Sequence, residues 1–189
     1  MAKIFKQILI ITVLSIAVAF LVNWINPKGI PLVMDMSKYS TEQSDKLKEE
    51  FLNNPYDTTE NTKSLIKNPR LNKDGFVDPQ NIKLDFAKIL YHKKALFIDA
   101  RTPEEFAQGR IKGAINIPYD VFHNKTKEEK TEMLKGLNKN GIIVCYCKGG
   151  DCEISIDLAY DIARLGFNSV NIYIGGYGEW EHSGYPVEK

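Results

Sequence analysis

The chain has few of the residues that would suit it to nucleic acid or to a metal. Its 189 residues carry a formal net charge of only +1, so the strong positive charge typical of nucleic-acid-binding proteins is missing. It has three histidines, and none is spaced to pair with a cysteine. Its three cysteines are an odd number, which fits chemistry better than a disulfide framework. We therefore expect no nucleic-acid partner, no metal and no cofactor.

One long apolar run stands out from this balanced composition. Ile8 to Ile25 is nearly all apolar, and about 20 such residues span a bilayer as a helix. Because Lys3 and Lys6 precede the run, the positive-inside tendency places the N-terminus in the cytoplasm and the rest outside, periplasmic or at the surface in a bacterium. A cleaved signal peptide is the alternative, since Ala17-Val18-Ala19 has a small-x-small pattern. We favour an uncleaved single-pass transmembrane anchor over residues 1–26.

The remaining chain changes character near residue 80. Residues 27–80 are polar and contain several prolines, which is typical of a stalk. Within them, Ser40 to Leu52 has a thin apolar stripe that predicts one short helix packed loosely on the domain. Residues 81–189 are more regular and form the predicted domain.

Helical and strand patterns alternate along that domain. Helices are predicted at 84–91, 103–108, 127–137 and 153–165, and strands at 95–98, 114–117, 142–146 and 170–174. Thr126 and Glu129 form a capping-box pattern at the start of the third helix. The alternation predicts an α/β fold with a mostly parallel central sheet flanked by helices. Ligands of such sheets bind beyond the carboxyl ends of the strands, where Cys147 and Asp99 fall.

The most informative segment runs from Val144 to Glu153, a strand followed by a glycine-containing loop and a helix. Amides of the loop and the helix N-terminus converge there, which favours a thiolate. We therefore interpret Cys147 as a reactive nucleophile that ionises easily, with Cys152 as a second thiol. Three buried core cysteines are the alternative. Cys145, which shares a strand face with Cys147 by the two-residue period, is expected in the core. Zinc is disfavoured because Cys145, Cys147 and Cys152 have no clear fourth ligand.

Several segments of the domain form one pattern, in this order: Phe97-Ile98-Asp99-Ala100-Arg101, Gly109 to Pro118, the loop opened by Cys147, and Ile174-Gly175-Gly176 with Trp180 and Gly184-Tyr185-Pro186. Together these segments resemble the rhodanese family of sulfurtransferases. The resemblance covers roughly Asn81 to Lys189 and implies a single α/β domain. It also implies that Cys147 takes a sulfane sulfur from a donor, becomes a persulfide and passes the sulfur to a nucleophilic acceptor. A loop of N–H donors stabilises such an anion without a metal.

The chain departs from the family pattern within the loop. Many family members have a basic residue where this chain has Cys152, and Lys148 is the only cation of the loop. We therefore expect weak activity on doubly charged thiosulfate and expect Cys152 to resolve a persulfide on Cys147. A phosphatase is disfavoured, because the sixth residue after Cys147 is Glu153 rather than arginine. Asp99 is expected to be structural; the expected substrate contacts are Arg101, Lys148, Gly149, Gly150, Asp151 and Glu153.

These observations favour a membrane-anchored rhodanese-like sulfurtransferase or persulfide-handling protein. Its expected partners are a small sulfur donor, a thiol or other nucleophilic acceptor, the membrane and a membrane redox protein. Two alternatives remain: a non-catalytic rhodanese-like binding module, and a thiol-disulfide oxidoreductase that uses Cys147 and Cys152.

Overall fold

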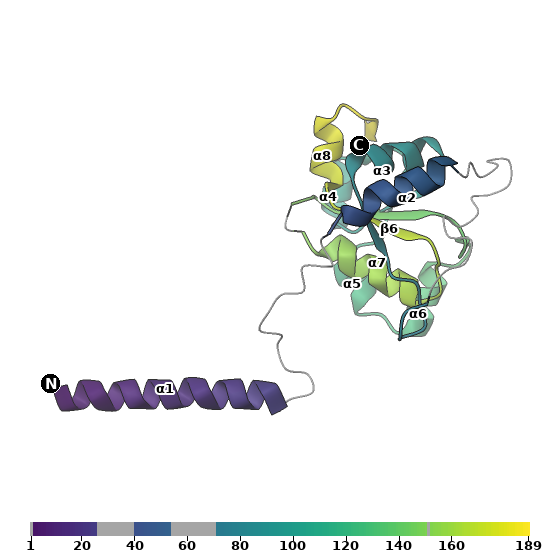
Figure 1. Cartoon of the computed structure of the whole chain (residues 1–189). Coiled ribbons are helices and arrows are strands. Elements are labelled where there is room, and N and C mark those ends of the chain that lie inside the picture. The colour runs from purple at the N-terminus through teal and green to yellow at the C-terminus, as the bar shows by residue number, and fades with distance from the viewer. Residues whose placement is uncertain (1, 26–39, 54–70, 151) are drawn as a thin grey trace. The chain divides into compact units, whose positions relative to one another are not determined.

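The computed structural model describes residues 2–25, 40–53, 71–150 and 152–189 (Figure 1). The chain divides into two compact units, Met1–Met36 and Ser37–Lys189. Each unit is described by itself. Asp151, one of the expected substrate contacts, lies outside the described residues.

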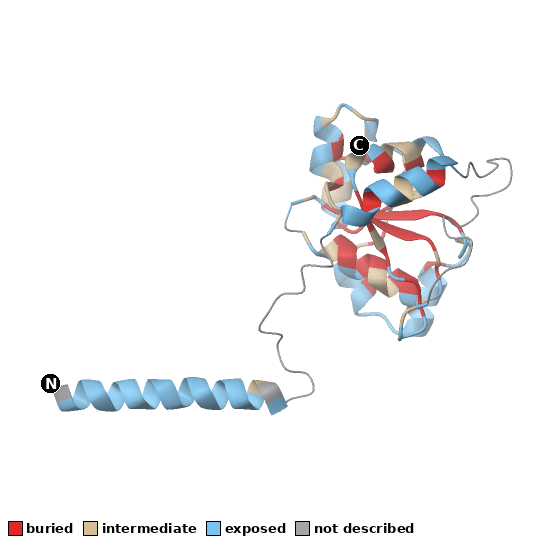
Figure 2. Cartoon of the chain, in the orientation of Figure 1, coloured by how far each residue is buried: buried red, intermediate tan, exposed pale blue. Residues whose placement is uncertain are grey.

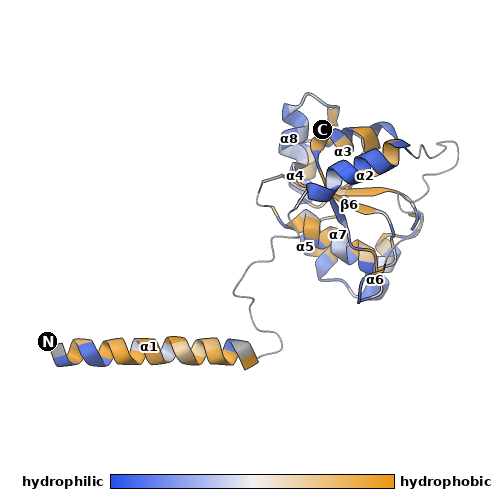
Figure 3. Cartoon of the chain, in the orientation of Figure 1, coloured by the Kyte–Doolittle hydropathy of each residue, from blue (hydrophilic) through white to orange (hydrophobic). Residues whose placement is uncertain are grey.

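The first unit contains helix α1 (Ala2–Ile25). Its segment Lys3–Asn23 is long and apolar enough to cross a membrane, a property that membrane anchors share with N-terminal signal sequences. Its apolar residues are exposed and recur along the visible length of the helix (Figures 2 and 3). The hydroxyls of Thr12 and Ser15 donate to main-chain carbonyls four residues earlier, both at 2.9 Å. Hydroxyls satisfied within a helix suit apolar surroundings.

The second unit is built on a five-stranded sheet with the order β1-β6-β5-β2-β4, in which every pair is parallel. The strands are β1 (Gln80–Ile82), β2 (Leu96–Asp99), β4 (Ile115–Asn116), β5 (Ile143–Tyr146) and β6 (Val170–Tyr173). A small antiparallel pair joins β3 (Arg110–Ile111) to β7 (Val187–Glu188). The parallel α/β fold predicted from the sequence is confirmed.

Helices cover both faces of the sheet, as Figure 1 shows. Helices α5 (Tyr119–His123), α6 (Lys127–Met133) and α7 (Ile154–Arg164) lie on one side; α2 (Glu42–Asn53), α3 (Leu84–His92) and α8 (Gly176–His182) lie on the other. Helix α4 (Pro103–Gln108) follows β2. On the central strand, Ile143 and Cys145 join one core cluster and Val144 and Tyr146 join the other. This alternation explains why all four residues of β5 are buried.

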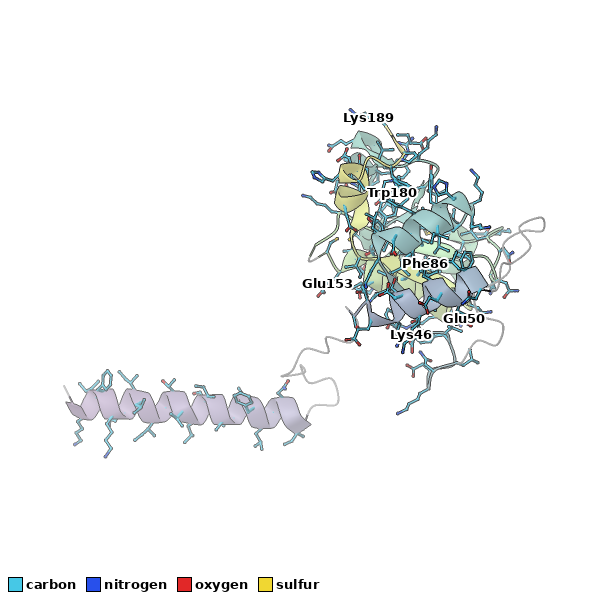
Figure 4. The ribbon with its side chains drawn as sticks, turned by 45° about the horizontal axis from the view of Figure 1, so that its top comes forward. Lys46, Glu50, Phe86, Glu153, Trp180 and Lys189 are labelled. Carbon is cyan, nitrogen blue, oxygen red and sulfur yellow. The ribbon has the colours of Figure 1, made fainter. Side chains whose placement is uncertain are left out.

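Helix α2 comes from the segment that the sequence assigns to the stalk, and it packs on α3. Its Phe51 is 7% exposed and lies against Phe86, with ring centroids 5.8 Å apart. The buried hydroxyl of Ser44 accepts a hydrogen bond from the Lys83 amide at 3.1 Å. Figure 4 shows Phe86 between α3 and α2, and Lys46 and Glu50 along the opposite edge of α2. Leu52 is exposed, although the sequence pattern placed it on the apolar stripe.

Local signals predicted most of the regular elements. The capping box at Thr126 and Glu129 is present, with both reciprocal hydrogen bonds. Helix α6 ends at Met133 rather than at residue 137, and Gly136, with φ +87°, lies in the turn beyond it. The sequence patterns missed α5, β1 and the β3–β7 pair. These elements are too short for a hydrophobic period to show.

Candidate active site

The candidate site lies at the carboxyl edge of the sheet, where Cys147 directly follows the central strand β5. A loop leads from there to the start of helix α7 at Ile154. Asp99, the last residue of β2, is paired in register with Tyr146 at the end of β5. The structure therefore brings together the two strand ends that the sequence indicated.

The loop is held in place by the first amides of helix α8. The Tyr177 amide donates to the Cys147 carbonyl at 2.7 Å, and the Gly178 amide donates to the Lys148 carbonyl at 3.0 Å. Gly149 has φ +102°, and a Cβ atom built on it would lie 2.2 Å from the Gly175 carbonyl oxygen. A side chain at that position would thus separate the two backbones. The first amides of α8 thus satisfy the loop carbonyls, while the amides of Lys148 and Gly149 act on the thiols.

The sulfur of Cys147 is enclosed by groups from the far end of the loop. Cys147 is 1% exposed, and its thiol donates to the main-chain oxygen of Cys152 at 3.2 Å. The Ser155 hydroxyl donates to the same sulfur at 3.4 Å. The hydrogen bond with Cys152 and burial raise the pKa of Cys147 despite Ser155 and the Gly149 amide. The expectation that this thiol ionises easily is therefore wrong for the reduced pair, because its proton is held and water is excluded.

Cys152 has the opposite environment. It is half-buried rather than enclosed. The Cys147 thiol, together with the amides of Lys148, Ile154 and Gly149, lowers its pKa to about 6 against the opposing effect of burial. The amide of Ile154 belongs to the N-terminus of α7, where the helix dipole also favours negative charge. The converging amides predicted for this loop therefore stabilise a thiolate at Cys152 at least as much as at Cys147.

The other expected contacts lie around this pair. Lys148, Gly150 and Glu153 are exposed and Gly149 is half-buried. Figure 4 places Glu153 at the rim of the domain. Lys148 and Glu153 therefore present one positive and one negative side chain near the thiols.

Asp99 and Arg101 form a buried ion pair. They are 0% and 5% exposed, and Arg101 Nη2 lies 2.6 Å from Asp99 Oδ2. Arg101 Nε also donates to Asp99 Oδ1, at 3.0 Å, and Nη2 donates to the Gly109 carbonyl at 2.7 Å. The guanidinium packs over the ring of Tyr177, 4.5 Å from its centroid. Arg101 thus supports the residue whose amide holds the loop, and this geometry favours a positioning role over direct contact with substrate.

Ser155 was not identified from the sequence. It occupies the first turn of α7, is 1% exposed and faces Cys147. A polar residue on the apolar face of a predicted helix was the available signal. Cys145 is fully buried in the core, as its position two residues before Cys147 predicted. Among the described residues, no three His, Cys, Asp or Glu side chains are grouped to hold a metal ion.

A strand, a tight loop carrying a cysteine and a helix N-terminus thus lie at one sheet edge, in a segment that also matches a known family. The family model described as Rhodanese-like domain matches residues 84–183. The chain belongs to this family. Within the rhodanese-like domain, the matched range includes every described residue of the site.

Two individual proteins similar to the rhodanese-like domain carry sulfurtransferase names. "Thiosulfate sulfurtransferase 16, chloroplastic" of Arabidopsis thaliana is 32% identical over 116 residues, which cover 58% of this chain and 93% of that protein. The putative mitochondrial thiosulfate sulfurtransferase of Schizosaccharomyces pombe is 30% identical over 93 residues, 47% of this chain and 64% of that protein. The chain therefore spans less than two thirds of the second relative. These relatives support a sulfurtransferase-type function.

A solved structure shows the fold alone. The structure of EanB in complex with ergothioneine aligns with a TM-score of 0.51 and 19% identity, covering 58% of this chain and 32% of that one. At this identity, only the arrangement of the sheet and helices carries over to the rhodanese-like domain.

Proposed function

We propose that this protein is a sulfurtransferase that handles sulfane sulfur through the dithiol Cys147 and Cys152. The observation that supports this most directly is their geometry. The Cys147 thiol donates to the main-chain oxygen of Cys152 at 3.2 Å, beside amides of the loop and of α7. Two thiols so placed can accept a sulfur atom on one sulfur and be attacked by the other.

The family resemblance assigns the persulfide to Cys147, and the second thiol, where the chain departs from the family pattern, gives Cys152 the resolving role. A persulfide is an anion at neutral pH, and backbone N–H groups aimed at the loop stabilise it as they stabilise a thiolate. The second thiol then attacks the inner sulfur of the persulfide. A disulfide forms, and the outer sulfur leaves as sulfide.

The charges around the site bear on the donor. Lys148 is the exposed cation of the loop, Glu153 stands nearby, and the Nε and Nη2 donors of Arg101 are taken by Asp99 and Gly109. A dianionic donor such as thiosulfate is bound best by a forked guanidinium, which this site does not offer. Organic persulfides, whose persulfide group carries at most one negative charge, are the better match.

The anchor completes the proposal. Helix α1 holds the protein in a membrane with its N-terminus in the cytoplasm and the rhodanese-like domain outside. This orientation rests on Lys3 and Lys6, which precede the apolar run. A membrane redox protein that supplies dithiols is then the natural partner. A protease-accessibility assay on sealed vesicles tests the orientation. Protease on the extracytoplasmic side of the membrane should digest the domain, and protection of the domain from that side would contradict the orientation.

The activity is tested with the full chain in detergent. The reduced protein is incubated with cysteine persulfide, and released sulfide is measured for wild type, Cys145→Ala and the double variant Cys147→Ser/Cys152→Ser. Wild type and Cys145→Ala should release sulfide at equal rates, and the double variant should not exceed the uncatalysed rate. Equal release by all three would overturn the proposal.

A second candidate follows from the same contact between the thiols. A dithiol pair without sulfane chemistry would act as a thiol-disulfide oxidoreductase. It would form a reversible disulfide with dithiol and disulfide reagents, yet release no sulfide from cysteine persulfide. A binding module would do neither.

A further inference from the structure

A second cavity, of about 260 Å³, lies between α6 and α7. Its walls come from these two helices and the residues beside them: Lys125, Lys127, Lys130, Asp161, Arg164 and Leu165. We call it the basic cavity, because four of these described residues are basic and one is acidic. Helix α7 begins at Ile154, beside the thiol loop, and Asp161 lies about two turns or about 10 Å further along it. The basic cavity is therefore distinct from the candidate active site.

Two basic side chains of the cavity share one carboxylate. Lys130 Nζ lies 2.7 Å from Asp161 Oδ2, and Arg164 Nη1 lies 3.1 Å from Asp161 Oδ1. The side chains of Lys130 and Asp161 are only 14% and 13% exposed, so salt screens their charges weakly. Asp161 holds both basic groups in place but neutralises only one of them. This part of the cavity therefore keeps an excess positive charge.

Two exposed lysines add to that charge. Lys127 has no ion-pair partner among the residues that the structure describes. Lys125 Nζ lies 3.2 Å from Glu129 Oε1, but both side chains are exposed, and an exposed ion pair of this kind is weak. The basic cavity thus brings several positive groups to one small volume with too few carboxylates to neutralise them.

We propose that the basic cavity binds a phosphate monoester, carried either by a soluble compound or by the headgroup of an anionic lipid. A phosphate monoester presents three acceptor oxygens, so it can contact several separate basic groups, whereas a carboxylate presents two. Lysine binds phosphate as a point charge and arginine as a fork of donors, and the cavity contains both. Its volume lies below the range of about 300–1,000 Å³ for drug-sized ligands, which suits a small anionic group. This site goes beyond the sulfur chemistry, since neither thiol is among its wall residues.

Protection of lysines from acetylation tests the site in the wild type. The full chain in a non-ionic detergent is acetylated briefly in sodium phosphate or in sodium chloride of equal ionic strength, and peptide mapping gives the rate at each lysine. Phosphate at twice its dissociation constant should slow acetylation of Lys125 and Lys127 about threefold, because about two thirds of the sites are then occupied. Lys46, an exposed lysine of α2 on the other face of the sheet, is the internal control and should react equally in both salts (Figures 1 and 4).

Variants at Lys127 test whether its charge matters. Lys127→Gln should raise about fivefold the phosphate concentration that half-protects Lys125, the effect of one basic residue on an anionic ligand. Lys127→Arg keeps the charge and should shift that concentration by less than about twofold. Lys46→Gln is the matched control and should leave it unchanged. Because Lys127 and Lys46 are exposed, all three variants should unfold at the wild-type denaturant concentration, which separates lost binding from lost folding.

A lipid experiment distinguishes the two sources of the phosphate group. The full chain is placed in nanodiscs of phosphatidylcholine alone or of phosphatidylcholine with phosphatidic acid, and acetylation is repeated. Protection of Lys125 and Lys127 by phosphatidic acid would support a lipid headgroup as ligand, and protection by inorganic phosphate alone would support a soluble compound. The proposal is overturned if neither probe protects these lysines. It is also overturned if Lys46 is protected equally, because the attraction would then be common to all exposed lysines.

Discussion

Two polar clusters lie at the same sheet edge and differ in how completely their groups are satisfied. Asp99 and Arg101 are almost fully enclosed, and their charges bond to each other and to the Gly109 carbonyl. Cys147 and Cys152 combine an enclosed thiol with a half-buried one that is surrounded by amides. A buried pair whose groups are all bonded stabilises the local geometry, whereas a partly open pair in which one thiol has a lowered pKa can react. The ion pair of Asp99 and Arg101 therefore has a structural role, and the two thiols are the candidate catalytic groups.

The largest expected effect comes from breaking the ion pair. Asp99→Ala leaves the buried guanidinium of Arg101 without its carboxylate, and we expect the free energy of unfolding to fall by about 3–5 kcal/mol. The control is Lys135→Ala, which removes an ion pair with Glu132 whose side chains are 74% and 71% exposed. It should cost under about 1 kcal/mol. Denaturant unfolding of the full chain in detergent measures both, and equal losses would contradict the distinction between the clusters.

A smaller effect is expected where the loop touches α8. Gly149→Ala places a Cβ atom 2.2 Å from the Gly175 oxygen at φ +102°. We expect a loss of about 1–3 kcal/mol in unfolding free energy and at least tenfold slower sulfide release. Gly136→Ala is the matched control, since φ is +87° and nothing lies within 4 Å of the added atom. If Gly136→Ala slowed sulfide release as much, the contact with Gly175 would not be the cause.

Ser155→Ala sharpens the description of the thiol pair. Removing the hydroxyl that donates to Cys147 leaves that sulfur less well oriented and its thiolate less stabilised. Closure of the disulfide between Cys147 and Cys152 should slow by about tenfold, the change in rate that corresponds to the loss of one hydrogen bond to a charged group. Ser183→Ala, which removes a hydroxyl bonded to the Trp180 carbonyl in α8, is the control. Stopped-flow detection of the released thiol measures the rate; an unchanged rate in Ser155→Ala would deny Ser155 this role.

The smallest effect concerns donor charge. Glu153→Gln removes an exposed negative charge beside the loop, and sulfide release with thiosulfate and a dithiol should rise about two- to fourfold at low salt. Added salt should erase the gain, because exposed charges are screened. Glu128→Gln, on α6, should change nothing. A gain that persists in high salt would point to a cause other than charge.

Residues with local signals were predicted best. Cys145 in the core, the Thr126 cap and the sheet edge holding Cys147 and Asp99 followed from alternation and capping. Ser155 did not, because it reaches Cys147, eight residues earlier, only through the folding of the loop. The contact of α8 with the loop did not, because it joins segments far apart in the chain. Converging loop amides and the helix N-terminus predict easy ionisation at Cys147. The structure transfers it to Cys152, which the amides of both loop and helix reach.

The amino-acid sequence alone determined the parallel α/β domain, its family and the two thiols at one strand end, because periodicity and motif spacing are properties of the chain itself. Only the tertiary structure decided which sulfur is enclosed and which is reachable. Burial and converging amides depend on how α7 and α8 pack around the loop. A thiol's pKa follows those surroundings and not its place in the motif.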